Sequence, residues 1–147
     1  MIRRYQHTQI GYLTIIALGI PMFLIIRLID FYDNNWIPWF VFIILGICLV
    51  LFATLRVIIE ADFIEIRFGT GIIRKRFLLK EIESYRVVKN PWYYGRGIRF
   101  TPHGWLFNVS GFYAIELKMK SGKKDRIGTD VPNELEKAIG PVIEKRL

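Results

Sequence analysis

The sequence predicts a membrane-anchored α+β protein, and three observations predict it. Two long apolar segments, residues 10–29 and 36–55, stand in the N-terminal part of the chain. Beyond them apolar and polar residues alternate in short runs, which is typical of half-buried strands. The chain then returns to a helical period near its end. We therefore divide the 147 residues into a transmembrane hairpin, 1–56, and a β-rich domain, 57–147.

Both apolar segments have the length that a membrane span requires. A helix rises about 1.5 Å per residue, so about 20 residues cross a hydrocarbon core of about 30 Å. Segment 36–55 carries no charge, whereas segment 10–29 contains Pro21, which we expect to kink the helix, and Arg27 near its end. A cleaved signal peptide is the alternative for the first segment, but no small-residue cleavage site follows it.

The charges that flank the two segments predict how they cross the membrane. Arg3 and Arg4 precede the first segment, Arg56 follows the second, and the connection 30–35 has two acids and no Lys or Arg. Cytoplasmic loops are rich in Lys and Arg. We therefore expect a multi-pass cell-membrane protein with both termini in the cytoplasm.

The domain that follows is expected to be a small antiparallel barrel or sandwich. Glycine- and proline-containing turns separate about seven short alternating runs. The expected strands are 62–68, 72–78, 85–89, 97–101, 105–109, 113–119 and 124–128. Residues 79–84 have a short helical character, and Trp105, Phe107 and Tyr113 are expected in the core. A closing amphipathic helix begins near Pro132, and Gly140-Pro141 should kink or interrupt it.

Several stretches of this domain resemble a known family. They are residues 79–82 (LKEI), 95–99 (GRGIR), 104–111 (GWLFNVSG) and 127–135 (IGTDVPNEL). Over residues 58–139 the chain is similar to the bacterial pleckstrin-homology-like (PH-like) domains of small membrane proteins. The resemblance implies a seven-stranded barrel plugged by a C-terminal helix, for which two preceding transmembrane helices are a familiar arrangement. It implies no catalytic residue.

Composition and motifs argue against several classes of function. The net charge is +8, and residues 56–147 carry 18 Lys and Arg against 11 Asp and Glu. Such a domain beside a bilayer is attracted to anionic head groups. It has neither a long basic run nor a nucleic-acid-binding motif, so we expect no nucleic-acid partner. His7, His103 and the single Cys48 have no partner at a catalytic or metal-binding spacing. We therefore predict no enzyme, no metal and no cofactor.

A first candidate site is the basic hairpin formed by Arg67, Arg74, Lys75 and Arg76 around a glycine turn. In eukaryotic pleckstrin-homology domains, basic residues of the first hairpin bind inositol phosphates. Here the turn is tight, and Arg74 and Arg76 lie on one face of the strand with Lys75 on the other. The sequence thus favours nonspecific attraction to anionic lipid, or a plain solvated strand, over a specific phosphoinositide pocket.

A second candidate site is the aromatic loop of Trp92, Tyr93 and Tyr94, flanked by basic residues. Those residues are Lys89, Arg96 and Arg99. Exposed aromatic rings beside cations suit a bilayer interface or a protein partner. The alternative is that Trp92 or Tyr94 folds back and covers one end of the domain.

The leading functional hypothesis from the sequence is a noncatalytic, membrane-tethered adaptor. Its β-rich domain would bind a protein, a peptide or a second copy of itself, since sheet edges accept an added strand. The alternative hypothesis is a sensor of anionic lipid surfaces that uses Arg74, Lys75, Arg76, Arg96 and Arg99.

Overall fold

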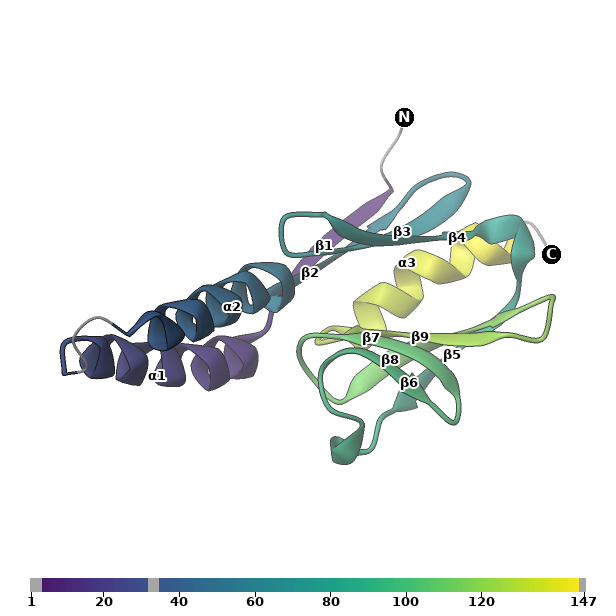
Figure 1. Ribbon diagram of the computed structural model, residues 1–147. Coiled ribbons are helices and arrows are strands. Elements are labelled where there is room, and N and C mark those ends of the chain that lie inside the picture. The colour runs from purple at the N-terminus through teal and green to yellow at the C-terminus, as the bar shows by residue number, and fades with distance from the viewer. Residues whose placement is uncertain (1–3, 32–34, 146–147) are drawn as a thin grey trace.

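The structure, a computed structural model, describes residues 4–31 and 35–145. Two helices project from one side of a β-rich domain that ends in a third helix (Figure 1). This is the α+β arrangement that the sequence predicts. Arg3 and residues 32–34 of the connection between the two apolar segments lie outside the described residues, so their part in the predicted topology stays a prediction.

The described elements follow one another along the chain in a simple order. They are β1 (Tyr5–Ile10), α1 (Tyr12–Ile29), α2 (Trp36–Phe52), β2 (Thr54–Ile59), β3 (Phe63–Phe68), β4 (Ile73–Leu78), η1 (Leu79–Glu81), β5 (Ile82–Lys89), η2 (Trp92–Tyr94), β6 (Gly97–Thr101), β7 (Gly104–Asn108), β8 (Tyr113–Met119), β9 (Lys124–Thr129) and α3 (Pro132–Glu144).

The helix α1 is long and apolar enough to cross a membrane, whereas α2 is an apolar helix of 17 residues. Neither helix has a buried residue, so their apolar side chains face outward. Both predicted spans are slightly too long. Ile10 belongs to β1, and Thr54 and Leu55 belong to β2, because the chain enters a sheet on either side of the helices.

The strand β1 precedes the helices, and the sequence analysis did not predict it. It pairs antiparallel with β2 along its whole length, from Tyr5 opposite Ile59 to Ile10 opposite Thr54. The helical hairpin is therefore an insertion between two neighbouring strands. The predicted boundary between residues 56 and 57 falls inside β2, so a fragment 57–147 would lack β1 and half of β2.

Two sheets build the domain, with strand orders β1-β2-β3-β4 and β5-β8-β9-β7-β6. All the pairs are antiparallel except β7 with β9, which run parallel. The described strands do not close into a barrel, because each sheet keeps two edge strands. Of the predicted antiparallel barrel or sandwich, the closed barrel is therefore wrong, and one strand pair is parallel instead of antiparallel. Short runs of alternating residues specify strands but not which strands become neighbours.

One apolar core joins the two sheets. Phe107 of β7 lies 6.4 Å from Phe68 and 6.3 Å from Phe77, both in the other sheet, between ring centroids. The helix α3 lies between the sheets (Figure 1) and adds Leu135 and Ile139 to this core.

Two predictions about this core are wrong. The pair Gly140-Pro141 does not interrupt α3, which continues to Glu144. Gly140 is packed so closely on Tyr85 that an added Cβ would lie 2.8 Å from the Tyr85 hydroxyl. Trp105 and Tyr113 are not core residues, since they stand about two-fifths exposed on their strands.

Candidate functional site

The basic hairpin of β3 and β4 is largely neutralised by one buried acid. Glu65 is 1% exposed, and both Arg67 and Arg76 donate hydrogen bonds to its carboxylate. Arg76 stands directly opposite Glu65 in the strand pair. Burial alone would raise the pKa of Glu65, but the hydrogen bonds and charges of Arg76 and Arg67 lower it below its ordinary value of 4.5. The charges of these two arginines are therefore compensated by Glu65 within the domain.

Lys75 lies on the opposite face of β4 and bridges the two sheets. Its Nζ is 3.8 Å from Oδ2 of Asp125 and 5.6 Å from the ring centroids of Phe77 and Phe107. Burial raises the pKa of Asp125 although Lys75 acts to lower it. Of the four basic residues of this hairpin, only Arg74 forms no ion pair among the described residues.

A second buried acid, which the sequence analysis missed, neutralises the other sheet. Glu116 stands directly opposite Arg86 on β5 and Arg126 on β9, and it accepts hydrogen bonds of 2.9 Å from the Nε of each. Burial alone would raise the pKa of Glu116, but Arg126 and Arg86 lower it. Arg126 also donates to Oδ1 of Asn90 at 2.9 Å. Only the strand pairing brings these groups together, so no local sequence signal could have found them.

The aromatic loop is exposed. Trp92 is 81% exposed and Tyr93 is 68% exposed, so the alternative in which Trp92 folds back over the domain is wrong. The Tyr94 side chain is half-buried and its hydroxyl lies 3.0 Å from Nδ1 of His103. Lys89 stands over the ring of Tyr113.

Arg96 and Arg99, like Arg74, form no ion pair among the described residues. Each is held only by a backbone carbonyl. Nη1 of Arg96 donates to Val109 O at 3.3 Å, and Nε of Arg99 donates to Arg96 O at 3.1 Å. Since a guanidinium has five N–H donors, most of the donors of both side chains stay available.

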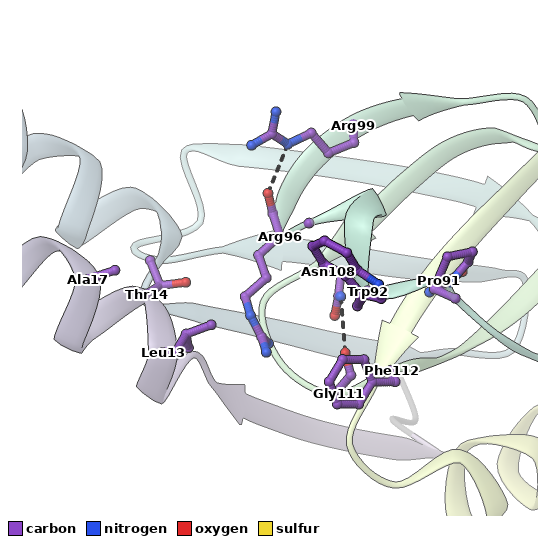
Figure 2. A pocket seen from close by; sticks show the side chains of 12 residues that line it. Leu13, Thr14, Ala17, Pro91, Trp92, Arg96, Arg99, Asn108, Gly111 and Phe112 are labelled. Carbon is purple, nitrogen blue, oxygen red and sulfur yellow. Dashed lines mark hydrogen bonds between the residues drawn. The ribbon is translucent and has the colours of Figure 1, made fainter.

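A pocket of about 470 Å³ lies between the start of α1 and the aromatic loop (Figure 2). Thr14 and Ala17 of α1 form one wall, and Trp92, Asn90 and Arg96 belong to the facing wall. Figure 2 shows the Arg96 side chain reaching down toward Leu13 and Gly111, while Arg99 points the opposite way. Within residues 4–31 and 35–145, no acidic residue lines this pocket or the adjoining hollow, to which Leu18 and Phe52 contribute.

The β3–β4 turn lies against the end of the other helix. Gly69 has a φ of +51°, and an added Cβ would lie 2.1 Å from the carbonyl oxygen of Val50 in α2. Only glycine fits this close approach. The next turn residues carry Ile72 outward, where it is 76% exposed.

The domain thus presents one side to the bases of both helices. We call this side the helix-proximal face and define it by five exposed or half-buried residues. They are Ile72, Arg74, Trp92, Arg96 and Arg99. The predicted site residues divide accordingly: Arg74, Trp92, Arg96 and Arg99 belong to this face, whereas Arg67, Lys75 and Arg76 are tied into the sheets.

Comparison of the chain with protein-family models, with curated proteins and with solved structures finds no match in any of the three. The resemblance to PH-like domains therefore stays a prediction.

The chemistry that the helix-proximal face offers is that of an anion-binding surface. Its polar groups are guanidinium groups that form no ion pair among the described residues, and its apolar groups are an indole and an aliphatic side chain. Among the described residues, no group of three His, Cys, Asp or Glu side chains could hold a metal ion.

Proposed function

We propose that this chain is a noncatalytic membrane module whose β-rich domain lies on the bilayer surface and binds anionic lipid head groups. The helices α1 and α2 anchor it as a two-span hairpin, with both termini in the cytoplasm. The observation that carries the proposal is the position of Trp92 and the unpaired Arg96 and Arg99 beside the base of α1.

The insertion of the helices between β1 and β2 supports the two-span anchor. The N–H of Gly11 donates to Ala53 O at 2.7 Å, so the domain end of α1 and that of α2 are at the same level. If α1 crosses about 27 Å of hydrocarbon, α2 returns over about the same distance, since its 17 residues rise about 26 Å. Their outward apolar side chains would be costly to expose to water.

The helix-proximal face supports contact with lipid head groups. Tryptophan is enriched at membrane interfaces, where the ring is half in water and half in apolar surroundings. Each arginine near an anionic surface contributes about 1 kcal/mol of attraction. On the first sheet, the exposed Ile72 and Arg74 follow the β3–β4 turn, whose Gly69 packs against the end of α2. They repeat the combination of an apolar and a basic group seen at Trp92 and Arg96.

The adaptor hypothesis differs in the surface that it uses. It requires an edge strand, and the edges are β1, β4, β5 and β6. Two of these edges carry distinguishing groups: the Tyr5 hydroxyl of β1 is buried without a hydrogen-bond partner among the described residues, and Arg99 of β6 belongs to the helix-proximal face itself. Binding of a protein partner or of a second copy therefore stays an alternative prediction.

The test measures how deep Trp92 lies in a bilayer. The full chain carrying Trp36→Phe, Trp39→Phe and Trp105→Phe keeps Trp92 alone among its tryptophans. In vesicles that contain phospholipids brominated near the head group, we expect strong quenching of Trp92 fluorescence. Quenching should be greater in anionic than in neutral vesicles, and the difference should shrink near 1 M salt, where screening is almost complete.

The matched control moves the reporter to the other side of the domain. It adds Trp92→Phe and Lys120→Trp, because the β8–β9 turn lies far from the helices (Figure 1). We expect little quenching at residue 120. Equal and weak quenching at both positions would overturn the proposal and favour a domain that stands away from the lipid, as an adaptor would.

A further inference from the structure

The pocket between α1 and the aromatic loop contains a half-buried cation that lacks an anion. Arg96 is partly covered, yet its only bond is the 3.3 Å contact to the carbonyl of Val109. Taking a charge out of water is unfavourable unless a charged or strongly hydrogen-bonding partner compensates it. In the two sheets of this protein, Glu65 and Glu116 are such partners for other arginines. Arg96 has none among the described residues.

A second group in the pocket wall also lacks a partner. Asn90 is 4% exposed and lines the pocket, and its Nδ2 makes no hydrogen bond. The assignment of this atom as the donor is fixed, because Oδ1 of the same amide accepts from Arg126. An unsatisfied buried donor costs free energy. The lining residues thus include a cation, a spare donor and, in Oδ1 of Asn108, a spare acceptor. The cation and the spare donor both call for an acceptor with negative charge.

The position of the pocket along α1 indicates where the anion comes from. Thr14 and Ala17, which line it, lie within about 8 Å of the first residue of α1 at 1.5 Å per residue. If the 18 residues of α1 span the hydrocarbon core, this level is the boundary between acyl chains and phosphates. The wall that α1 contributes is mainly apolar, since Leu13 and Ala17 flank Thr14.

We propose that this pocket binds one phospholipid, with the lipid phosphate on the guanidinium of Arg96 and an acyl chain against Leu13 and Ala17. Arg99, whose Nε bonds to the Arg96 carbonyl oxygen while its guanidinium lies apart from that of Arg96 (Figure 2), is exposed and contributes charge rather than the main contact. The proposal rests on the proposed function in one respect, the placement of α1 in the bilayer. It goes further in assigning a single lipid to a defined pocket.

The experiment titrates the full chain, in a neutral detergent, with lipids short enough to be added from solution. The probe is dioctanoyl phosphatidic acid, and the matched ligands are dioctanoyl glycerol, which lacks the phosphate, and inorganic phosphate, which lacks the chains. Binding is read from the fluorescence of Trp92, which lines the pocket, in the single-tryptophan background. We expect saturable binding of the phosphatidic acid that is at least about tenfold tighter than that of either matched ligand.

The variants test the assignment of Arg96. Arg96→Gln should weaken binding roughly tenfold or more, because it removes a charged hydrogen bond. Arg96→Lys keeps the charge but loses the planar guanidinium. Its affinity for the phosphatidic acid should lie between that of Arg96→Gln and that of the unmodified chain. Arg99→Gln should have a smaller effect. Lys120→Gln, which also removes one positive charge but on the β8–β9 turn far from the helices (Figure 1), should leave the affinity unchanged.

Each contrary outcome has a distinct meaning. Equal affinity for inorganic phosphate would indicate a site for free anions, and equal affinity for dioctanoyl glycerol would indicate an apolar groove without phosphate recognition. Either result, or equal losses of affinity in Arg96→Gln and Lys120→Gln, would overturn the assignment of the pocket. If Trp92 is nevertheless quenched in vesicles, the proposed surface function survives. If the lipid binds in detergent but Trp92 is not quenched, the surface function fails and the pocket stands.

Discussion

The two basic segments of this domain look alike in the sequence and differ in the fold. In the β3–β4 hairpin, Arg67 and Arg76 share the buried carboxylate of Glu65. In the segment after the aromatic loop, Arg96 and Arg99 bond only to backbone carbonyls. The number of cations in a segment therefore does not tell how many are available to a ligand. What decides it is whether the fold places a buried acid within reach of each of them, as Glu65 is for Arg67 on the same strand and for Arg76 on the strand opposite.

The largest expected effect comes from removing the acid of the fully enclosed cluster. Glu116→Ala leaves the charge of Arg126, whose side chain is 6% exposed, without a partner. We expect the free energy of unfolding to fall by about 3–5 kcal/mol. The measurement is denaturant unfolding of the full chain in mild detergent.

The matched control for Glu116→Ala is Glu83→Ala. Glu83 pairs with Lys118 at 3.1 Å, and both side chains are almost half exposed. Such a surface pair contributes about 0–1 kcal/mol. Similar losses in the two variants would contradict the view that Glu116 compensates a buried charge.

A smaller effect is expected at the first cluster. Glu65→Ala should lower the free energy of unfolding by about 1–3 kcal/mol. Although Glu65 is buried, the side chains of Arg67 and Arg76 are 35% and 56% exposed, so water can reach the freed guanidinium groups. The same unfolding experiment checks this. A loss larger than that of Glu116→Ala would reverse the ranking of the two clusters.

The pH dependence of stability should report the same clusters. The pKa values of Glu65 and Glu116 are lowered in the folded chain, so their stabilisation is present above the ordinary value of 4.5 and is lost as the pH falls toward the folded values. In that range the unfolded chain binds more protons, and each group contributes a slope of up to about 1.4 kcal/mol per pH unit.

One group acts in the opposite sense. The pKa of Asp125 is raised by burial, so its ionisation costs stability and acidification recovers part of that cost. Comparing the unfolding free energy from about pH 6 to pH 3 in the unmodified chain and in Glu65→Gln isolates one glutamate. As the pH falls, the free energy of unfolding should decline less steeply in the variant than in the unmodified chain. Parallel curves would show that the pKa of Glu65 is not lowered by folding.

The smallest effect is expected at Lys75. Lys75→Met removes the 3.8 Å contact to Asp125 and the cation over two rings, but it keeps an apolar chain between the sheets. Because this side chain is 43% exposed, the loss should be about 1 kcal/mol or less. Trp92 quenching in anionic vesicles should not change, since Lys75 lies outside the helix-proximal face. A drop in quenching would indicate that Lys75 does contact lipid, as the lipid-sensor hypothesis from the sequence assumed.

Local patterns in the sequence determine much of this protein. Apolar runs specify α1 and α2, because an unbroken apolar segment has few other stable environments. Alternation and glycine turns locate most strands to within one or two residues, as at β3, β4 and β8. The sequence did not decide whether Trp92 is exposed, because a ring in a loop that contains proline and glycine can either fold back over the domain or project into solvent.

Only the tertiary structure decided which distant segments meet. β1 is a polar strand that gains its place by pairing with β2 across the 43 residues between Ile10 and Thr54, and no local pattern encodes that partner. The parallel pairing of β7 with β9 and the placement of Glu116 between Arg86 and Arg126 have the same origin. Strand pairing is a long-range choice that depends on the whole core. The basic residues can therefore be read from the sequence. That Arg96 has no acidic partner among the described residues is decided by the tertiary structure.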